Sequence, residues 1–213
     1  MNEFRFNTKL DQTLLLGRKA RNLAELLVGI KTVPGSSIYY HTHKFLQQHH
    51  FLSPEPPNDF AYWITEVLNE ARLGEIMSSV DIVQFHTLRE VRERFVEILE
   101  GHLKSAEKLS TAPSGQEFHF MGSRTFVLGT PHVAHTLSEF REALKRVSVN
   151  SLYYHIFDAK LRLEKDENDF SRWFRDLGTS ELAEKVARLD PYTYTLEGLR
   201  SRIIQLVEFY DTH

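Results

Sequence analysis

The sequence contains no cysteine among its 213 residues. This absence excludes disulfide bridges, thiolate metal sites and cysteine nucleophiles. Long apolar runs are also missing: the longest one near the N-terminus is Leu14–Leu16, and the charged residues Glu3 and Arg5 precede it. Both a signal peptide and a membrane span need a longer apolar run than this one. We therefore expect a cytoplasmic protein with no membrane partner.

An excess of charge of either sign is missing as well. The chain has 26 Lys and Arg residues against 29 Asp and Glu residues, for a net charge of −3. Nucleic-acid-binding domains usually show a basic excess, so nucleic acid is not an expected partner. The apolar content of 41% is ordinary for a globular protein.

The sequence lacks the common catalytic motifs. The segment Gly29–Gly35 does not continue into the Lys-Ser/Thr of a phosphate-binding loop, and there is no Gly-x-Ser-x-Gly or His-Glu-x-x-His. These absences leave nucleotide-binding, serine-hydrolase and zinc-protease functions without support. We expect no cofactor.

One unusual stretch occurs twice. Ser37–His41 reads SIYYH and Ser151–His155 reads SLYYH, while Asn58–Trp63 reads NDFAYW and Asn168–Trp173 reads NDFSRW. The repetition of two such segments in the same order indicates a duplication within the chain. We therefore predict two homologous halves related by a pseudo-twofold axis.

The boundary between the predicted halves follows from composition. Ser110–Gly115 reads STAPSG, which is typical of a linker. We place the first half at residues 1–104, the linker at 105–116 and the second half at 117–213. The two halves could also share one core and form one compact domain.

Local patterns predict a mainly helical α+β fold with short strands. Short apolar runs that end at glycine indicate strands that stop at a turn, and alternating runs indicate two more. The predicted strands are Phe4–Phe6, Leu14–Gly17, Phe118–Phe120, Phe126–Gly129, Ile82–Phe85 and Tyr192–Tyr194. Residues that can cap the first turn of a helix precede each helical pattern. The predicted caps are Asn22, Ser37 or a neighbour, Asn58, Thr87, Thr136, Ser151 or a neighbour, Asn168 and Thr195.

These segments together resemble a known family. The patterns LGT, TL-E, S-YYH, NDF--W and DPYTYTLEGLR are similar to those of an uncharacterised bacterial family that carries only a domain-of-unknown-function label. The resemblance covers nearly the whole chain. It implies membership of that family and supplies no activity, cofactor or catalytic residue.

The recurring histidines are the first candidates for chemistry. His41 and His155 lie on the apolar stripes of their predicted helices, and Asp59 and Asp169 recur with them. A histidine on a core face usually forms a structural hydrogen bond to a carboxylate. The same pair could instead be a general base oriented by a carboxylate. Because two copies of an active site are less common than two copies of a structural contact, we favour the structural interpretation.

The histidines that are not repeated are the second candidates. His43, His49 and His50 follow His41 within ten residues. Side chains two residues apart on a helix point about 200° apart, so His41 and His43 would not share a metal ion. We expect no metal site and favour exposed histidines near a helix end.

Two functions follow. We favour a non-enzymatic binding or regulatory protein with an unknown protein or small-molecule partner, and a homodimer is compatible with the sequence. Its contact region would be the unrepeated segment Thr42–Pro57, an exposed segment that its prolines stiffen. The binding candidates are Tyr40, His43, His49, His50 and Trp63. The recurring aromatic residues otherwise fit core packing better than a stacking platform. The alternative is a small metal-dependent or His/Asp hydrolase that uses His41, His43 and Asp59.

Overall fold

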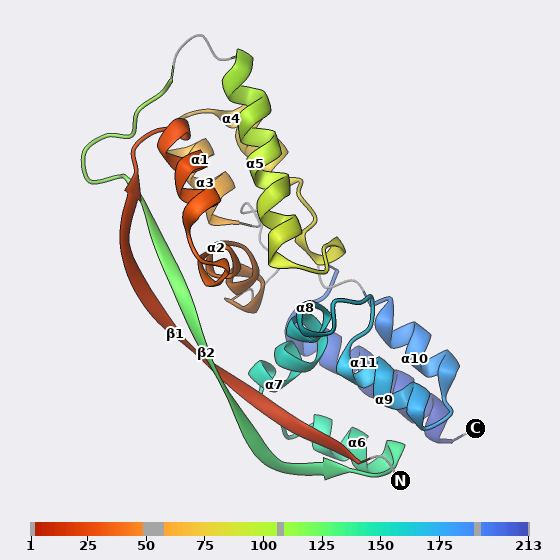
Figure 1. Ribbon diagram of the computed structural model, residues 1–213. Coiled ribbons are helices and arrows are strands. Elements are labelled where there is room, and N and C mark those ends of the chain that lie inside the picture. Colours follow the sequence, from red (N-terminus) through yellow and green to blue (C-terminus); the bar gives the residue numbers. More distant parts are fainter. Residues whose placement is uncertain (1–2, 49–57, 106–108, 190–192, 213) are drawn as a thin grey trace. The chain divides into compact units, whose positions relative to one another are not determined.

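The computed structural model describes residues 3–48, 58–105, 109–189 and 193–212, and it is mainly helical (Figure 1). In this part of the chain one antiparallel sheet is present, and it has two long strands, β1 (Phe4–Ala20) and β2 (Phe118–Ala134). The predicted α+β class with mostly helical content is confirmed.

The helices follow the strands along the chain in two groups. Between β1 and β2 lie α1 (Leu23–Thr32), α2 (Gly35–Gln48), α3 (Asp59–Glu66), α4 (Ala71–Ser78), the 3-10 helix η1 (Ile82–Gln84) and α5 (Leu88–Ser105). After β2 lie α6 (Leu137–Leu144), α7 (Val149–Tyr153), the π-helical turn η2 (Tyr154–Asp158), α8 (Ala159–Leu163), α9 (Asp169–Asp176), α10 (Ser180–Ala187) and α11 (Leu196–Asp211).

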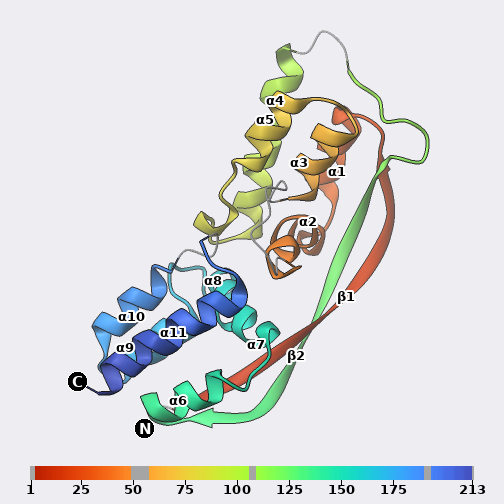
Figure 2. The same ribbon diagram turned by 180° about the vertical axis from the view of Figure 1, so that it is seen from behind.

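The described residues form two compact units. Unit 1 contains residues 3–10 and 125–212, and unit 2 contains residues 11–48 and 58–124. Each strand therefore contributes one end to each unit. The first helix group belongs to unit 2 and the second to unit 1 (Figures 1 and 2). These units are defined by contacts and not by sequence repetition, so the division into repeat halves with a linker at residues 105–116 stays a prediction.

Short-range hydrogen bonds explain where the helices begin. The side chains of Asn22, Asn58, Thr136 and Asn168 each accept a hydrogen bond from the backbone amide three residues later. Thr195 caps α11 in the same way. These contacts satisfy amides that have no partner within the helix. The predicted caps at these five positions are confirmed.

At the start of α5 the predicted capping box is present. The Glu90 amide donates to Thr87 Oγ1 over 3.2 Å, and the Thr87 amide donates to Glu90 Oε2 over 2.9 Å. At the repeated Tyr-Tyr-His segments the cap is a neighbour of the predicted serine in one case: Ser148 caps α7, and Ser151 lies inside it. Ser37 lies inside α2, which begins at Gly35.

The predicted strands are partly wrong in length and place. β1 and β2 continue through Gly17 and Gly129, where the sequence predicts them to end. Gly17 has a φ of 68°, which glycine adopts without steric cost, so β1 passes through it. Ile82–Gln84 forms a 3-10 helix instead of a strand, since the Asp81 side chain accepts from the Val83 amide and turns the chain. Thr193 and Tyr194 form no strand, and Tyr192 lies outside the described residues.

Each unit has an aromatic core that forms around one end of one strand. In unit 1, Phe4 and Phe6 of β1 contact Phe140 and Phe170, with ring centroids 5.2–6.0 Å apart in the four strand–helix pairs. Trp173 stacks on Phe140 at 5.4 Å. Burying five aromatic side chains makes this cluster a main source of stability for the unit.

Unit 2 has a similar cluster. Phe118 of β2 lies 5.3 Å from Phe60 and 5.7 Å from Trp63, and Phe60 lies 5.4 Å from Phe95 of α5. Phe120 is fully buried beside Phe118. The predicted core role of the recurring aromatic residues holds for most of them, although Tyr62 is 53% exposed.

Candidate functional site

His155 connects three elements in unit 1. Its ring is 2% exposed, and its Nδ1 lies 2.7 Å from Asp169 Oδ2 at the start of α9. Its Nε2 accepts a hydrogen bond of 2.8 Å from the backbone amide of Asn7 in β1. The hydroxyl of Ser151, one helical turn earlier, donates to the Asn7 carbonyl over 2.6 Å. One histidine and one serine thus satisfy both backbone groups of Asn7.

His41 has the same two ring contacts in unit 2, a carboxylate and a strand amide. Its Nδ1 lies 2.8 Å from Asp59 Oδ2, and its Nε2 accepts a hydrogen bond of 2.9 Å from the backbone amide of Met121 in β2. This ring is also 2% exposed. The predicted pairing of each recurring histidine with its recurring aspartate is therefore present in the structure.

The two backbone amides decide the tautomer of each ring. An amide can only donate, so Nε2 must be the unprotonated nitrogen and Nδ1 must carry the hydrogen. Nδ1 then donates to the aspartate. Both ring nitrogens are used within the protein, and neither His41 nor His155 keeps a lone pair that could accept a proton from a substrate.

The two aspartates differ in their surroundings. Asp169 is 18% exposed and also contacts Arg162, whose Nη2 donates to Asp169 Oδ2 over 2.6 Å. Burial raises the pKa of Asp169, but the hydrogen bond from His155 and the charge and hydrogen bond of Arg162 outweigh burial and lower this pKa overall. Asp59 is 43% exposed. The unit 1 link is thus the more enclosed and more highly charged of the two.

A buried ion pair that the sequence did not indicate lies near the unit 1 link. Lys9 of β1 has a fully buried side chain whose Nζ lies 2.7 Å from Asp158 Oδ2 and 4.4 Å from the centre of the Tyr153 ring. Alternation along β1 would point Thr8 inward and Lys9 outward, but the burial pattern shifts after Phe6. No local signal in the sequence marks that shift.

The other candidates from the sequence lie in different environments. His43 is 4% exposed, stacks on Tyr39 with ring centroids 5.4 Å apart, and has Nδ1 2.8 Å from Thr42 Oγ1. Trp63 is 5% exposed, and its Nε1 donates to the Gln116 carbonyl over 2.7 Å. His43 is buried, so the prediction of an exposed histidine is wrong at this position.

The last candidates from the sequence are Tyr40, His49 and His50. Tyr40 is partly exposed, with Lys44 Nζ 4.4 Å from the centre of its ring. His49, His50 and residues 51–57 of the predicted contact segment lie outside the described residues. Within residues 3–48, 58–105, 109–189 and 193–212, no group of three or more histidine and carboxylate side chains is arranged to hold a metal ion.

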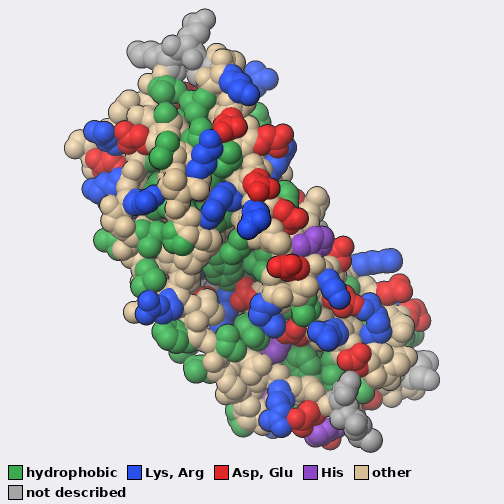
Figure 3. Space-filling view, in the orientation of Figure 1, with side chains coloured by type: hydrophobic (Ala, Val, Ile, Leu, Met, Phe, Trp, Pro, Cys, Tyr) green, Lys and Arg blue, Asp and Glu red, His purple; other side chains and the backbone are tan. Residues whose placement is uncertain are grey.

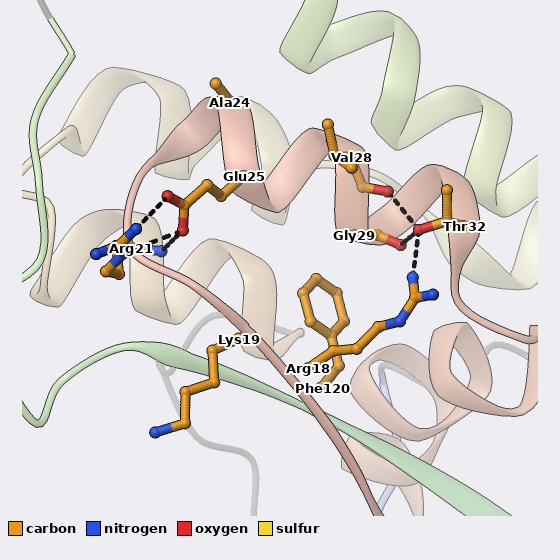
Figure 4. Close-up of a pocket in the computed structure, with 9 residues that line it drawn as sticks. All are labelled: Arg18, Lys19, Arg21, Ala24, Glu25, Val28, Gly29, Thr32 and Phe120. Carbon is orange, nitrogen blue, oxygen red and sulfur yellow. Dashed lines mark hydrogen bonds and ion pairs between the residues drawn. The ribbon is translucent and has the colours of Figure 1, made fainter.

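A groove in unit 2 is the second candidate site (Figure 4). It has a volume of about 480 Å³ and runs between α1 and the end of β1. The fully buried Phe120 ring lies beneath the groove, against Gly29; a Cβ atom at Gly29 would lie 2.1 Å from Phe120 Cζ. Val28 forms an apolar wall and is 60% exposed. The groove therefore has an apolar body.

Three cations and one carboxylate surround this groove. Arg18 donates to Thr32 Oγ1 over 2.6 Å, and Arg21 forms an ion pair of 3.1 Å with Glu25. Lys19 is exposed, and its side chain points away from α1 in Figure 4. The net charge of these four residues is positive. Elsewhere on the face shown in Figure 3, side chains of both signs are interspersed.

Comparison with known proteins agrees with this description. Residues 1–208 match the model of a family described as "Family of unknown function (DUF5752)". The chain belongs to the DUF5752 family. The predicted membership of a family of unknown function is thereby confirmed.

A solved structure extends the comparison. The DUF5752 chain is similar to OrfY from Thermoproteus tenax, with a TM-score of 0.84 and 29% sequence identity over 100% of this chain and 97% of that one. No curated protein matches the chain. Neither comparison indicates an enzymatic role. No helix in the described part of the DUF5752 chain is long and apolar enough to cross a membrane.

Proposed function

We propose that this chain is a cytoplasmic, non-enzymatic binding protein built from a duplicated unit. In this proposal the two histidine–aspartate pairs hold strands to helices, and the groove along α1 binds the ligand. The observation that carries the proposal is the use of both ring nitrogens in His41 and in His155 by the protein's own groups.

The contacts of the residues proposed for the alternative hydrolase also favour a non-enzymatic protein. A hydrolase that used His41, His43 and Asp59 would need a base with a free nitrogen near the substrate. His41 is buried between Asp59 and the Met121 amide, and His43 is stacked on Tyr39. The contacts of His41 and His43 therefore favour a structural role over proton transfer to a substrate.

Several contacts support the duplication. Arg92 donates to the Val33 carbonyl and Arg200 donates to the Val147 carbonyl, each over 2.7 Å. The Asn58 amide group likewise donates to the Met77 carbonyl over 3.0 Å. Asn168 makes the corresponding contact with the Val186 carbonyl over 3.5 Å. Matching side chains thus make matching contacts in both units, as duplicated segments would.

The groove favours a small organic acid as the ligand. Ligand sites typically have volumes of about 300–1,000 Å³ and are mostly apolar with a few polar groups that fix orientation. Val28 and Ala24, which line the groove and reach its surface, would contact the apolar body of such a ligand. Arg18 would contact its acidic group, and Lys19 would add positive charge nearby. Tyr40, His49 and His50 remain candidates for contact with a protein partner.

Paired alanine variants test the non-enzymatic assignment. His41→Ala and His155→Ala should each lower the free energy of unfolding by about 1–3 kcal/mol, because each leaves a buried backbone amide without its acceptor. The measurement is urea unfolding followed by circular dichroism. A His41→Ala variant with wild-type stability beside a destabilised His155→Ala variant would contradict the proposal and return His41 to a catalytic role.

Titration with 1-anilinonaphthalene-8-sulfonate, an apolar anion, tests the groove. Fluorescence should report binding to the wild-type protein, and R18E/K19E should weaken it by about tenfold, the equivalent of 1.4 kcal/mol. The control is R202E, since Arg202 is an exposed arginine of α11 in unit 1. Equal affinities of the wild-type protein, R18E/K19E and R202E would rule out the groove as the anion site.

A further inference from the structure

Exposed apolar side chains are concentrated on the strands of unit 1. Leu10 of β1 is 55% exposed, and Phe126, Val127 and Leu128 of β2 are 48%, 48% and 46% exposed. The other large apolar side chain of comparable exposure described in this unit is Phe209. Apolar side chains are visible over the middle of the two strands in Figure 3. Three consecutive residues of β2 expose both faces of the strand, because successive side chains point to opposite faces.

The outer edge of β2 at these residues pairs with no strand in the described part of the chain. The sheet has two strands in the described part of the chain, so each strand has one edge that no strand pairs. On β1, His155 and Ser151 cover the edge at Asn7. On β2, all residues from Arg124 to Gly129 are exposed.

Protective features are scarce along this edge. Proteins usually guard exposed strand edges with charged residues, prolines or bulges. Arg124 is the one charged residue in the segment 124–130, and the first proline after it is Pro131. An open, apolar edge with so little protection is suited to pairing with another strand.

We propose that the segment Arg124–Thr130 pairs in antiparallel fashion with the same segment of a second copy of the chain. The two sheets would then join into one four-stranded sheet across a twofold axis at Val127. A twofold interface uses the same patch on both copies, so the patch must be complementary to itself. This proposal does not depend on the groove in unit 2.

The register around Val127 meets that requirement. Phe126 of one copy would lie opposite Leu128 of the other, and Thr125 opposite Gly129. Arg124 would lie opposite Thr130, so the two Arg124 side chains would be at opposite ends of the pairing and would not repel each other. The pairing places apolar residues at the centre and polar residues at the rim, as in known interfaces.

Charge substitutions at the two facing positions test both the interface and its register. Size-exclusion chromatography with light scattering should give a dimer for the wild-type protein at high concentration. F126D/L128D should give a monomer, because carboxylates would face each other twice. F126D/L128K should give a dimer again, because each carboxylate would face an ammonium group.

The matched control is F209D, which places the same charge at an exposed apolar position of α11. It should form the same dimer as the wild-type protein. Far-UV circular dichroism establishes that all variants are folded. A wild-type protein that stays monomeric, a dimeric F126D/L128D, or a monomeric F126D/L128K would each overturn the proposed pairing.

Discussion

The backbone amide of Asn7 donates a 2.8 Å hydrogen bond to Nε2 of His155, a residue 148 positions later in the chain. The contact joins the first strand to the second group of helices. It also fixes the histidine as the tautomer that donates from Nδ1 to Asp169. The Asn7 amide, His155 and Asp169 therefore form one hydrogen-bonded network, and substituting one member should affect the others.

Asp169→Ala should cost more stability than Asp59→Ala. The first variant leaves the buried His155 ring and Arg162 without their shared acceptor, at a cost of about 1–3 kcal/mol. The second removes a carboxylate that is 43% exposed, where water can replace it, at a cost of less than about 1 kcal/mol. Urea unfolding of both variants measures the difference. A larger loss for Asp59→Ala would contradict the contrast between the two links.

Acid should weaken the unit 1 link. The folded protein holds the pKa of Asp169 below its ordinary value of 3.8, so the unfolded chain binds a proton first as the pH falls. The resulting stability is fully present above pH 3.8 and is lost below it, as the pH falls through the folded pKa. Arg162→Gln removes one cause of the lowered pKa. In urea unfolding between about pH 5 and pH 2, this variant should lose less stability on acidification than the wild-type protein.

Gly29→Ala should destabilise unit 2, although alanine favours helices. A Cβ at this position would lie 2.1 Å from Phe120 Cζ, and displacing the buried ring costs about 1–3 kcal/mol. The matched control is Gly101→Ala in α5, where a Cβ meets nothing within 4 Å. This control should gain about 0.5–1 kcal/mol from helix propensity. Thermal melting compares them, and a stabilised Gly29→Ala would disprove the close approach of α1 to Phe120.

Lys9→Met should destabilise unit 1 more than Lys9→Met combined with Asp158→Asn. The single variant leaves Asp158 without its cation in a mostly buried position, and breaking such a pair costs about 3–5 kcal/mol. The double variant removes both charges, and replacements of this kind are often near neutral. A double-mutant cycle in urea gives the coupling energy. Additive effects would mean that the two side chains do not act as a pair.

The sequence predicts contacts best where they depend on nearby residues. Caps such as Asn58 and Thr136 use an amide three residues away, so composition and spacing were sufficient. The pairing of His41 with Asp59 could be predicted for another reason, since the same two residue types recur at a similar distance in the second half of the chain.

Features that depend on contacts between distant residues could not be predicted from the sequence. Gly17 looked like a turn because glycine permits a positive φ, yet the strand uses that freedom without ending. The groove depends on Phe120 meeting Gly29, which are far apart in the chain. The burial of Lys9 depends on Asp158, at an even greater separation. No local sequence pattern indicates contacts between residues so far apart in the chain.

The division of each strand between two compact units has a consequence for how the protein is made. Unit 1 needs Phe4 and Phe6 from the start of the chain together with Phe140 and Phe170 from its second half. During synthesis Phe4 and Phe6 therefore stay exposed until residues as far as Phe170 have left the ribosome. Contacts over such separations slow folding, because a long loop must close before they form. The N-terminal strand is then exposed to chaperones and proteases for longer than any other part of unit 1.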